Sequence, residues 1–306
     1  MRKKSVFLSL CLIVCLLTGC SAVLQQPVVQ SDVPVFETKK PVKIALVLGG
    51  GGSKGLAHLG AIKELEAAGL RPDLIIGCSA GAIVGALYAD NPELTGLEET
   101  LFKMTRSDML DTTWFSRLGV VKGNALQRFL KKQLRSKTFD ELKIPLIVIA
   151  TDLFTGETIE LSQHDLPLAI GASCAIPGIF HPVLLHDRYL IDGGASSPVP
   201  VEIAKKYGAE VIIAIDVSEK LPSSKPSHLF GIAKRGMEIM YQKLVEKSLI
   251  HADISIRMEF QDVGMFSDHL HTQMFEHGRQ KVISLLPEIQ KKIKDVTLTS
   301  QLEANQ

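Results

Sequence analysis

The chain has 306 residues, of which 46% are hydrophobic, and its formal net charge is +1 at pH 7. The hydrophobic fraction is ample for a sizeable core, and a chain of this length can fold as one α/β domain. No basic stripe stands out in the sequence, which excludes a nucleic-acid-binding protein of the usual electropositive kind.

The first 19 residues predict a signal peptide that is removed from the mature protein. Three basic residues at 2–4 precede an apolar stretch at 6–16, which is too short to span a bilayer as a helix. The segment then ends in small residues directly before Cys20. This ending resembles a bacterial lipoprotein signal, and the resemblance implies that Cys20 is lipid-modified. An ordinary secretory signal with an incidental cysteine is the alternative.

A lipid-modified Cys20 would hold the protein on a membrane, because several acyl chains bind a bilayer more firmly than one. Residues 20–40 contain prolines and charged residues without periodicity, so we expect a flexible tether before a single domain at 41–306. We expect a location in the cell envelope, on the outer membrane if the host is Gram-negative, since serine rather than aspartate follows Cys20. Cys78 and Cys174 are expected to be small buried thiols.

Residues 42–48 form an apolar run that predicts a buried parallel strand, followed by a glycine-rich segment at 49–55 and a helix at 56–68. A Walker loop needs lysine and then serine or threonine after its last glycine. Here Lys54 precedes Gly55, so that interpretation fails. A dinucleotide-binding loop is also disfavoured, because the second strand leads to Ser79 rather than to a carboxylate that would bind ribose.

Residues 77–81 read Gly-Cys-Ser-Ala-Gly and stand between an apolar strand pattern and a helix pattern of small residues. This arrangement is typical of a nucleophile elbow, a strained turn that projects a serine hydroxyl from the edge of a sheet. Gly77 and Gly81 would prevent clashes with the flanking strand and helix. We therefore predict that Ser79 is a nucleophile. Tight packing of a helix on a strand is the alternative for this motif alone.

The glycine-rich segment has a natural role beside such a serine. Backbone N–H groups exposed at a helix N-terminus stabilise negative charge, and next to a nucleophile they form an oxyanion hole for acyl transfer. We predict the donors among Gly50, Gly51 and Gly52, with Gly51 and Gly52 preferred. Lys54 adds positive potential in this interpretation, and a solvated lysine without a role is the alternative.

An aspartate is the strongest downstream candidate for the base. Asp192 ends a short apolar strand, and Gly193 and Gly194 after it permit a tight turn. Partial desolvation would raise the pKa of its carboxyl group and make it a competent base. A plain turn residue is the alternative. Asp152 and Asp216 also follow strands but lack the glycines. Seven histidines after Ser79 are considered as alternatives for the base, and none stands in a sharp strand-end motif: His164, His181, His186, His251, His269, His271 and His277.

These three motifs, in this order, resemble the patatin-like phospholipase family, and bacterial members near its neuropathy-target-esterase branch are similar. The resemblance covers roughly 42–216 and includes 150–153 and 172–180. It implies a three-layer α/β/α fold with a mainly parallel central sheet. It also implies a dyad without histidine, in which Ser79 is the nucleophile, Asp192 is the proton acceptor and the glycines form the oxyanion hole. Four more residues complete the motifs: Lys54, Gly55, Gly193 and Gly194.

The rest of the chain predicts further elements. Helices are expected at 94–106, 124–134, 231–250 and 274–293, strands at 146–150 and 211–215, and an exposed loop at 220–227, with 228–306 forming a C-terminal helical region. Asn124 is a plausible N-cap, and 173–177 look like a helix start or a loop beside the site. Trp114 and Phe115 either contact lipid or pack in the core. His269 and His271 lack a Cys or Glu partner at ligand spacing, so we expect no metal.

The function expected from these patterns is that of a membrane-anchored serine acyl hydrolase. Phospholipids or lysophospholipids are the substrates that the resemblance implies, with no metal, organic cofactor or nucleic acid required. Two alternatives stay open. The first is an acyltransferase that moves acyl groups between lipids, and the second is a lipid-binding envelope lipoprotein whose site is vestigial.

Overall fold

The computed structural model describes residues 36–38, 40–111, 119–163, 165–260 and 270–304, the last eight of these as backbone alone. The predicted signal peptide and Cys20 lie outside the described residues, as do Trp114, Phe115, His164 and His269. What was expected of these positions stays a prediction. No helix in the described part of the chain is both long and apolar enough to cross a bilayer.

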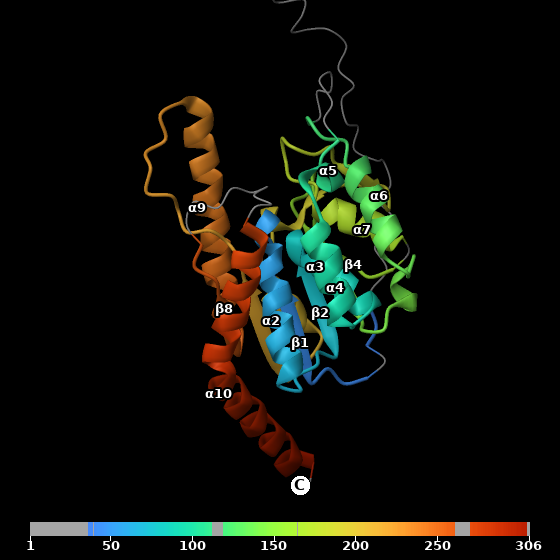
Figure 1. The fold of residues 1–306 in the computed structure, drawn as a ribbon, viewed down its shortest axis with the longest axis vertical. Coiled ribbons are helices and arrows are strands. Elements are labelled where there is room, and N and C mark those ends of the chain that lie inside the picture. Colours follow the sequence, from blue (N-terminus) through green and yellow to red (C-terminus); the bar gives the residue numbers. More distant parts are fainter. Residues whose placement is uncertain (1–35, 39, 112–118, 164, 261–269, 305–306) are drawn as a thin grey trace, which may run out of the picture.

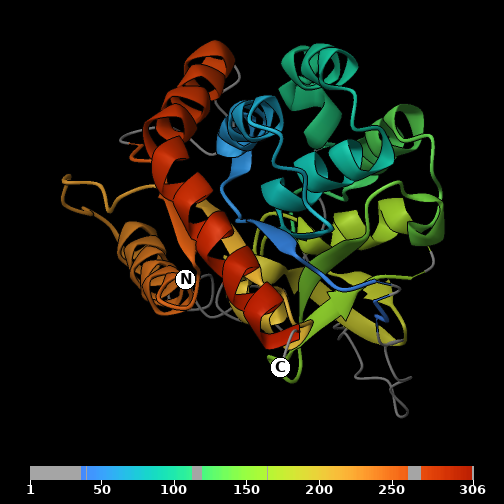
Figure 2. The ribbon, with the colours of Figure 1, turned by 90° about the horizontal axis from the view of Figure 1, so that it is seen from below.

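One central sheet organises the molecule (Figures 1 and 2). Across the described ranges it has eight strands. Five of them run parallel: β1 (Ile44–Leu48), β2 (Leu74–Cys78), β3 (Leu146–Asp152), β7 (Val211–Asp216) and β8 (Ile254–Arg257). The other three pair in antiparallel fashion: β4 (Thr158–Leu161), β5 (Val183–Leu185) and β6 (Arg188–Asp192). The prediction of a mainly parallel sheet is confirmed.

Strand β3 has an arrangement that matters for the site. Ile149 pairs with both β2 and β4, and Ala150 pairs with both β4 and β6. A strand has only two edges, so β2 and β6 share one edge of β3 and β4 occupies the other. Strand β6 therefore continues along the edge of β3 from the point where β2 ends.

Helices cover both faces of this sheet. On one face lie α2 (Leu56–Ala67), α3 (Ala80–Asp90), α4 (Leu94–Lys103), α5 (Arg106–Met109), α6 (Asn124–Gln133), α7 (Leu166–Ser173) and α10 (His271–Ala304), and on the other lie α8 (Val201–Lys206) and α9 (Leu229–Leu249). Alternate residues of β1 serve the two cores, with Leu46 and Leu48 on the first face and Ala45 and Val47 on the second. Burial on both faces explains why the central strands are continuous apolar runs. The predicted three-layer α/β/α fold is confirmed.

Helices α2 and α10 cross at two glycines. A Cβ atom added to Gly60 would lie 2.0 Å from the carbonyl oxygen of Phe275, and one added to Gly278 would lie 2.1 Å from that of Ala57. The two backbones therefore touch directly, which binds the C-terminal helix to the helix that follows the glycine-rich segment.

Two local predictions were wrong. The helix expected at 94–106 ends at Lys103, because a new cap at Thr105, with Asp108, starts the short helix α5. Asn124 is the first helical residue rather than the N-cap, which is Gly123; the carboxylate of Asp111 accepts hydrogen bonds from the amides of both.

Of the two possibilities for residues 173–177, the structure has the loop beside the site rather than a helix start, because α7 ends at Ser173 and both Cys174 and Ile176 line the same pocket as Ser79. That helix begins after Asp165, whose carboxylate accepts a hydrogen bond from the amide of Leu168 and caps the helix there. The exposed loop expected at 220–227 is present.

The crossing of α2 and α10 can be tested by changing Gly60→Ala. The new Cβ would overlap the carbonyl of Phe275, so we expect the free energy of unfolding in urea to fall by about 1–3 kcal/mol. Gly96→Ala is the matched control, since Gly96 is an exposed glycine of α4 with open space around it. This change should stabilise the protein by roughly 0.5–1 kcal/mol. Equal effects of the two substitutions would contradict the packing described.

Candidate active site

Ser79 occupies a strained turn between β2 and α3. Its backbone angles are φ 51° and ψ −117°, in a region that residues other than glycine seldom adopt. The Ser79 amide donates a 2.8 Å hydrogen bond to Oγ of Ser173, which in turn donates to the carbonyl of Ile149. Ser173 thus ties the turn to β3 and helps to hold the strained conformation.

Small residues let the turn approach β1. A Cβ atom on Gly81 would lie 2.1 Å from the carbonyl oxygen of Leu48, so any other residue would push α3 away from the end of β1. Gly77 and Gly55 also face close neighbours in α3. The end of β1 leads into the glycine-rich segment, and this close approach therefore brings that segment next to Ser79.

Asp192 meets Ser79 end to end along β3. Cys78, the last residue of β2, pairs with Ile149, and Asp192, the last residue of β6, pairs with the next residue, Ala150. Oγ of Ser79 donates a 2.7 Å hydrogen bond to Oδ2 of Asp192. The structure therefore brings the two predicted catalytic side chains into direct contact, although β6 runs opposite to β2.

The carboxylate of Asp192 lies in a nearly dry environment. Burial raises the pKa of Asp192 to about 6, while hydrogen bonds from Ser79 and from the Gly194 amide act in the opposite direction. The Gly194 amide donates to Oδ1 over 2.7 Å, which leaves Oδ2 directed at the serine. At neutral pH the group is therefore an ionised carboxylate of raised basicity, hydrogen-bonded to the hydroxyl whose proton it would accept.

The glycine loop, residues 49–52, runs beside the serine. A Cβ atom on Gly50 would lie 3.4 Å from Cβ of Ser79, and Gly52 lines the same cleft as Ser79. The Gly50 amide, however, donates to the carbonyl of Pro198 over 2.9 Å. The prediction of Gly50 as an oxyanion donor is therefore wrong, because its N–H is already engaged. The amides of Gly51 and Gly52 make no hydrogen bond within the described residues.

Two side chains that sequence analysis missed hold the carbonyls of this loop. Nε2 of His58 donates to the carbonyl of Gly49 over 2.8 Å, and Oη of Tyr241 donates to the carbonyl of Gly50 over 2.9 Å. Burial lowers the pKa of His58 to about 4, so the ring is neutral and Nδ1 carries no proton. His58 could have been noticed from the sequence, because it is a polar residue inside the apolar helix that follows the loop. Tyr241 comes from α9, 191 residues away, and carried no such signal.

Lys54 is buried rather than solvated. It is 5% exposed and forms a 3.4 Å ion pair with Glu219, and burial lowers its pKa despite that partner. The alternative of a solvated lysine is therefore wrong. Its charge is largely balanced by Glu219, so the pair fixes the start of the helix more than it adds net potential.

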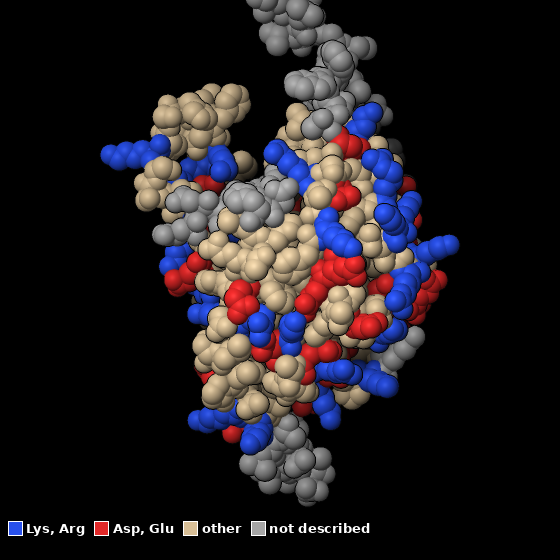
Figure 3. All heavy atoms as spheres, in the orientation of Figure 1, with Lys and Arg blue, Asp and Glu red and all other residues tan. Residues whose placement is uncertain are grey.

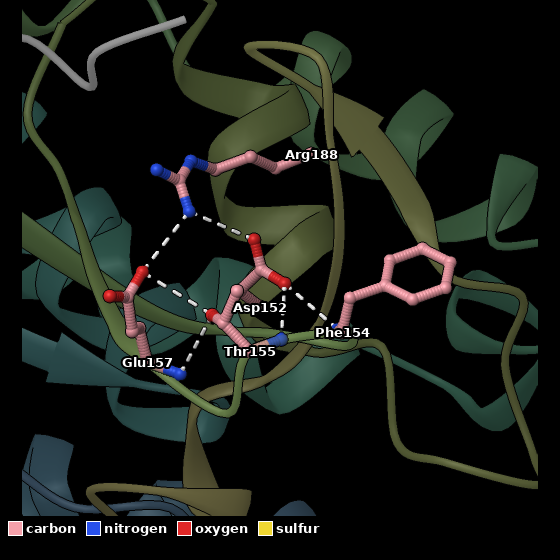
Figure 4. Close-up of polar contacts among 5 residues, drawn as sticks. All are labelled: Asp152, Phe154, Thr155, Glu157 and Arg188. Atoms are coloured by element: carbon pink, nitrogen blue, oxygen red, sulfur yellow. Dashed lines mark hydrogen bonds and ion pairs between the residues drawn. The ribbon is translucent and has the colours of Figure 1, made fainter. Parts of the chain in front are cut away.

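The rival bases have other partners. Asp152 accepts hydrogen bonds from the amides of Phe154 and Thr155 and pairs with Arg188 (Figure 4). Burial alone would raise the pKa of Asp152, but these amides and the guanidinium lower it. Asp216 accepts from the Ser218 amide and from Arg257. No described histidine is hydrogen-bonded to Ser79. Asp152 therefore has a structural hydrogen-bonding role.

Ser79 opens into an apolar cleft. The cleft is lined by side chains from α3, α4, α5 and the turn after α7, among them Ile83, Val84, Leu101, Met104, Met109, Ile176 and Phe180. Cys174 also lines it, and both Cys78 and Cys174 are buried free thiols, as predicted. Within the described residues, no group of three or more His, Cys, Asp or Glu side chains is placed to hold a metal ion. This mainly apolar lining favours an apolar group over a charged one beside the serine.

The chain is similar in sequence to known proteins. A model of the family "Patatin-like phospholipase" matches residues 46–205. Patatin-like phospholipase domain-containing protein 6 of Mus musculus is 31% identical over 209 residues, which are 66% of this chain and 15% of that protein. An NTE family protein of Mycobacterium tuberculosis is 32% identical over 178 residues, which are 58% of this chain and 49% of that protein. This chain thus spans less than half the length of these relatives.

A solved structure has the same fold. The crystal structure of VipD from Legionella pneumophila matches with a TM-score of 0.56, covering 90% of this chain and 73% of that one at 15% sequence identity. At this identity the likeness concerns the fold alone.

The burial of Asp192 leads to a prediction about pH. Reaction of Ser79 with a fluorophosphonate probe should need the ionised carboxylate, so the labelling rate should be level above about pH 6 and fall up to tenfold per pH unit below it. Labelling rates measured on the folded protein across this range provide the check. A rate independent of pH, or an acid limb near pH 7 that vanishes in a histidine variant, would contradict the assignment of Asp192.

Proposed function

The chain belongs to the patatin-like phospholipase family, and on this premise we propose that it is a serine acyl hydrolase that cleaves acyl esters of phospholipids or lysophospholipids. The observation that carries the proposal is the 2.7 Å hydrogen bond from Ser79 to Asp192 at the base of an apolar cleft. A strained serine and a buried carboxylate each lower the stability of the fold, and features of this kind cluster at functional sites. Their position beside two uncommitted glycine amides therefore favours a working site over a vestigial one.

The proposed reaction has two steps. Oγ of Ser79 attacks the ester carbonyl while its proton passes to Oδ2 of Asp192, and the resulting oxyanion accepts hydrogen bonds from the amides of Gly51 and Gly52. The tetrahedral intermediate collapses, the C–O bond to the alcohol breaks, and the alkoxide takes the proton from Asp192. Water then attacks the acyl-enzyme with the same carboxylate as base, which releases the fatty acid and restores Ser79.

The base and the oxyanion donors are both held in place before the reaction begins. The Asp192 carboxylate is fixed by Gly194, so proton transfer needs no movement of the base. Each oxyanion donor contributes roughly 2.7–4 kcal/mol of transition-state stabilisation in comparable enzymes. The carbonyls of Gly49 and Gly50, held by His58 and Tyr241, keep the preceding part of the loop from rotating.

We also propose that the enzyme works at a membrane of the cell envelope, anchored by lipid on Cys20. The support is the sequence at the N-terminus, where basic residues, a short apolar stretch and small residues precede the cysteine. Residues 20–40, without a periodic pattern, would serve as the tether between this anchor and β1.

The direct test incubates the full chain with mixed phospholipids and lysophospholipids and identifies the products by mass spectrometry. We expect free fatty acid, and a loss of roughly 10³-fold or more in rate for Ser79→Ala and Asp192→Asn, because the nucleophile and its base act as a unit. New esters in place of fatty acid would show an acyltransferase instead.

Two matched controls accompany this test. Ser162→Ala changes a serine that is also 7% exposed and whose hydroxyl has no hydrogen-bond partner among the described residues, and Asp152→Asn changes the buried aspartate assigned a structural role. Both should keep their activity per folded molecule. An active Asp192→Asn protein would end the proposed dyad, and an inactive wild-type protein that never labels at Ser79 would leave a binding protein.

The anchor is tested by Cys20→Ala. Without the thiol no lipid can be attached, so the protein should move from the membrane fraction to the soluble fraction or remain as the uncut precursor. Cell fractionation with labelled fatty acid measures both outcomes. Unchanged membrane association together with a normally cut, unlabelled N-terminus would contradict the lipoprotein interpretation.

A further inference from the structure

Helix α9 packs against the rest of the molecule along its C-terminal half. Val245 and Leu249 are buried there in the second core cluster, and Tyr241, in the middle of the helix, reaches the glycine loop. Residues 229–240 continue beyond Tyr241 for about 18 Å, at 1.5 Å per residue. Figure 1 shows this N-terminal half of α9 standing clear of the other helices.

The projecting half carries a row of exposed apolar side chains, here called the apolar face of α9: Leu229, Phe230, Ile232, Ala233, Met237, Ile239 and Met240. Phe230 is 81% exposed and Leu229 is 76% exposed. At 100° per residue the seven positions fall within an arc of about 180°, and the buried Val245 and Leu249 fall in the opposite half. The apolar face therefore points away from the body, and patches of this kind mark interaction sites.

The charges around the apolar face are mainly positive. Residues 220–247 contain six Lys or Arg and two Glu, in a chain whose net charge is only +1. Lys225, Lys234 and Lys243 are exposed. The side chains of Lys234 and Arg235 share one partner, Glu238, and Lys243 pairs with Glu246. Figure 3 shows this prominence as mostly tan, with blue groups beside it. A helix with an outward apolar face and basic flanks binds at the surface of anionic bilayers.

The middle of α9 is attached beside the glycine loop. Oη of Tyr241 bonds to Gly50, and the Gln242 side chain donates to the carbonyl of Glu219, the partner of Lys54. One end of α9 is thus fixed to the glycine loop and its ion pair, while the other end projects.

We propose that the apolar face of α9 docks on an anionic lipid bilayer and inserts Phe230 and its neighbours among the acyl chains. Such docking would be separate from the Cys20 anchor, because it would orient the domain rather than merely tether it. The docking itself needs no catalysis. Only its role in bringing the enzyme to its lipid substrate rests on the proposed function.

The test reads the depth of α9 directly. Full chains carrying Ser79→Ala, which prevents lipid hydrolysis, receive either Phe230→Trp or the control Lys131→Trp on the exposed side of α6. Each is mixed with phosphatidylglycerol vesicles whose acyl chains are brominated near the carbonyl. Fluorescence is compared with that of the parent chain, which keeps Trp114. This readout is specific to one position, so binding through the N-terminus does not disturb it.

We expect a blue shift and quenching at position 230, weaker with phosphatidylcholine vesicles or at high salt, and neither effect at position 131. Absence of quenching at 230 in vesicle-bound protein would overturn the proposal. A blue shift without quenching, together with a dimer in sedimentation equilibrium, would assign the apolar face to a second copy of the chain and overturn it as well.

A second measurement separates docking from chemistry. In otherwise native protein, Phe230→Asp with Met237→Asp should lower hydrolysis of anionic vesicles by about tenfold or more, because two apolar side chains can no longer enter the bilayer. Hydrolysis of a soluble short-chain ester should stay unchanged. Ile283→Asp, at an exposed position of α10, is the control. Equal rates of the double variant and the native protein on vesicles would contradict docking. If the native protein cleaves neither substrate, the proposed function is contradicted, and the quenching result alone decides docking.

Discussion

The hydrogen bond between Ser79 and Asp192 is the interaction on which the arrangement of the catalytic edge depends. Both residues are 7% exposed, so a carboxylate is kept almost without water. An unpartnered carboxylate would be costly there. The Ser79 hydroxyl and the Gly194 amide each supply a hydrogen bond, and the remaining penalty is expressed as a raised pKa. In the proposed mechanism, the same burial makes the Asp192 carboxylate basic enough to accept the proton of Ser79, so that one constraint links packing to chemistry.

The contact arises because β2 and β6 share one edge of β3. Strand β2 ends at Cys78, and β6 arrives from the opposite direction on the same edge, so that their last residues are adjacent. Ser173 then fixes the Ser79 amide from a third element. The glycine loop is held on its far side by side chains from α2 and α9. The glycine loop is therefore held by hydrogen bonds to several other elements. The amides of Gly51 and Gly52 make no hydrogen bond within the described residues.

Sequence patterns predicted the parts of this arrangement that are local. The central strands are apolar runs because both faces are buried, and the glycines around Ser79 show in the sequence because the backbone approach at Gly81 excludes other residues. Strand β8 was missed because its burial alternates over only four residues. The break between α4 and α5 was missed because the cap at Thr105 interrupts an otherwise continuous helical pattern.

Contacts between distant segments could not be predicted from periodicity. Tyr241 reaches the glycine loop from 191 residues away and stands in no motif with a chemical meaning of its own. Ser173 lies in the 172–180 segment that the resemblance includes, but its hydrogen bond with the Ser79 amide, 94 residues away, does not follow from that segment. The engagement of the Gly50 amide by Pro198 depends in the same way on the path of the chain before α8. In each case the missing information was tertiary, since the residue type permits the contact but only the fold brings the partner near.

The central claim is that the Ser79 hydroxyl, the Asp192 carboxylate and the glycine amides act together at one ester carbonyl of the substrate. A crystal structure of the protein with Ser79 phosphonylated by a fluorophosphonate would examine all three together. The account predicts a phosphonyl oxygen within hydrogen-bond distance of the amides of Gly51 and Gly52, with Asp192 still beside Oγ of Ser79 and the alkyl chain in the apolar cleft. An oxygen that points away from those amides, or an adduct on a residue other than Ser79, would contradict it.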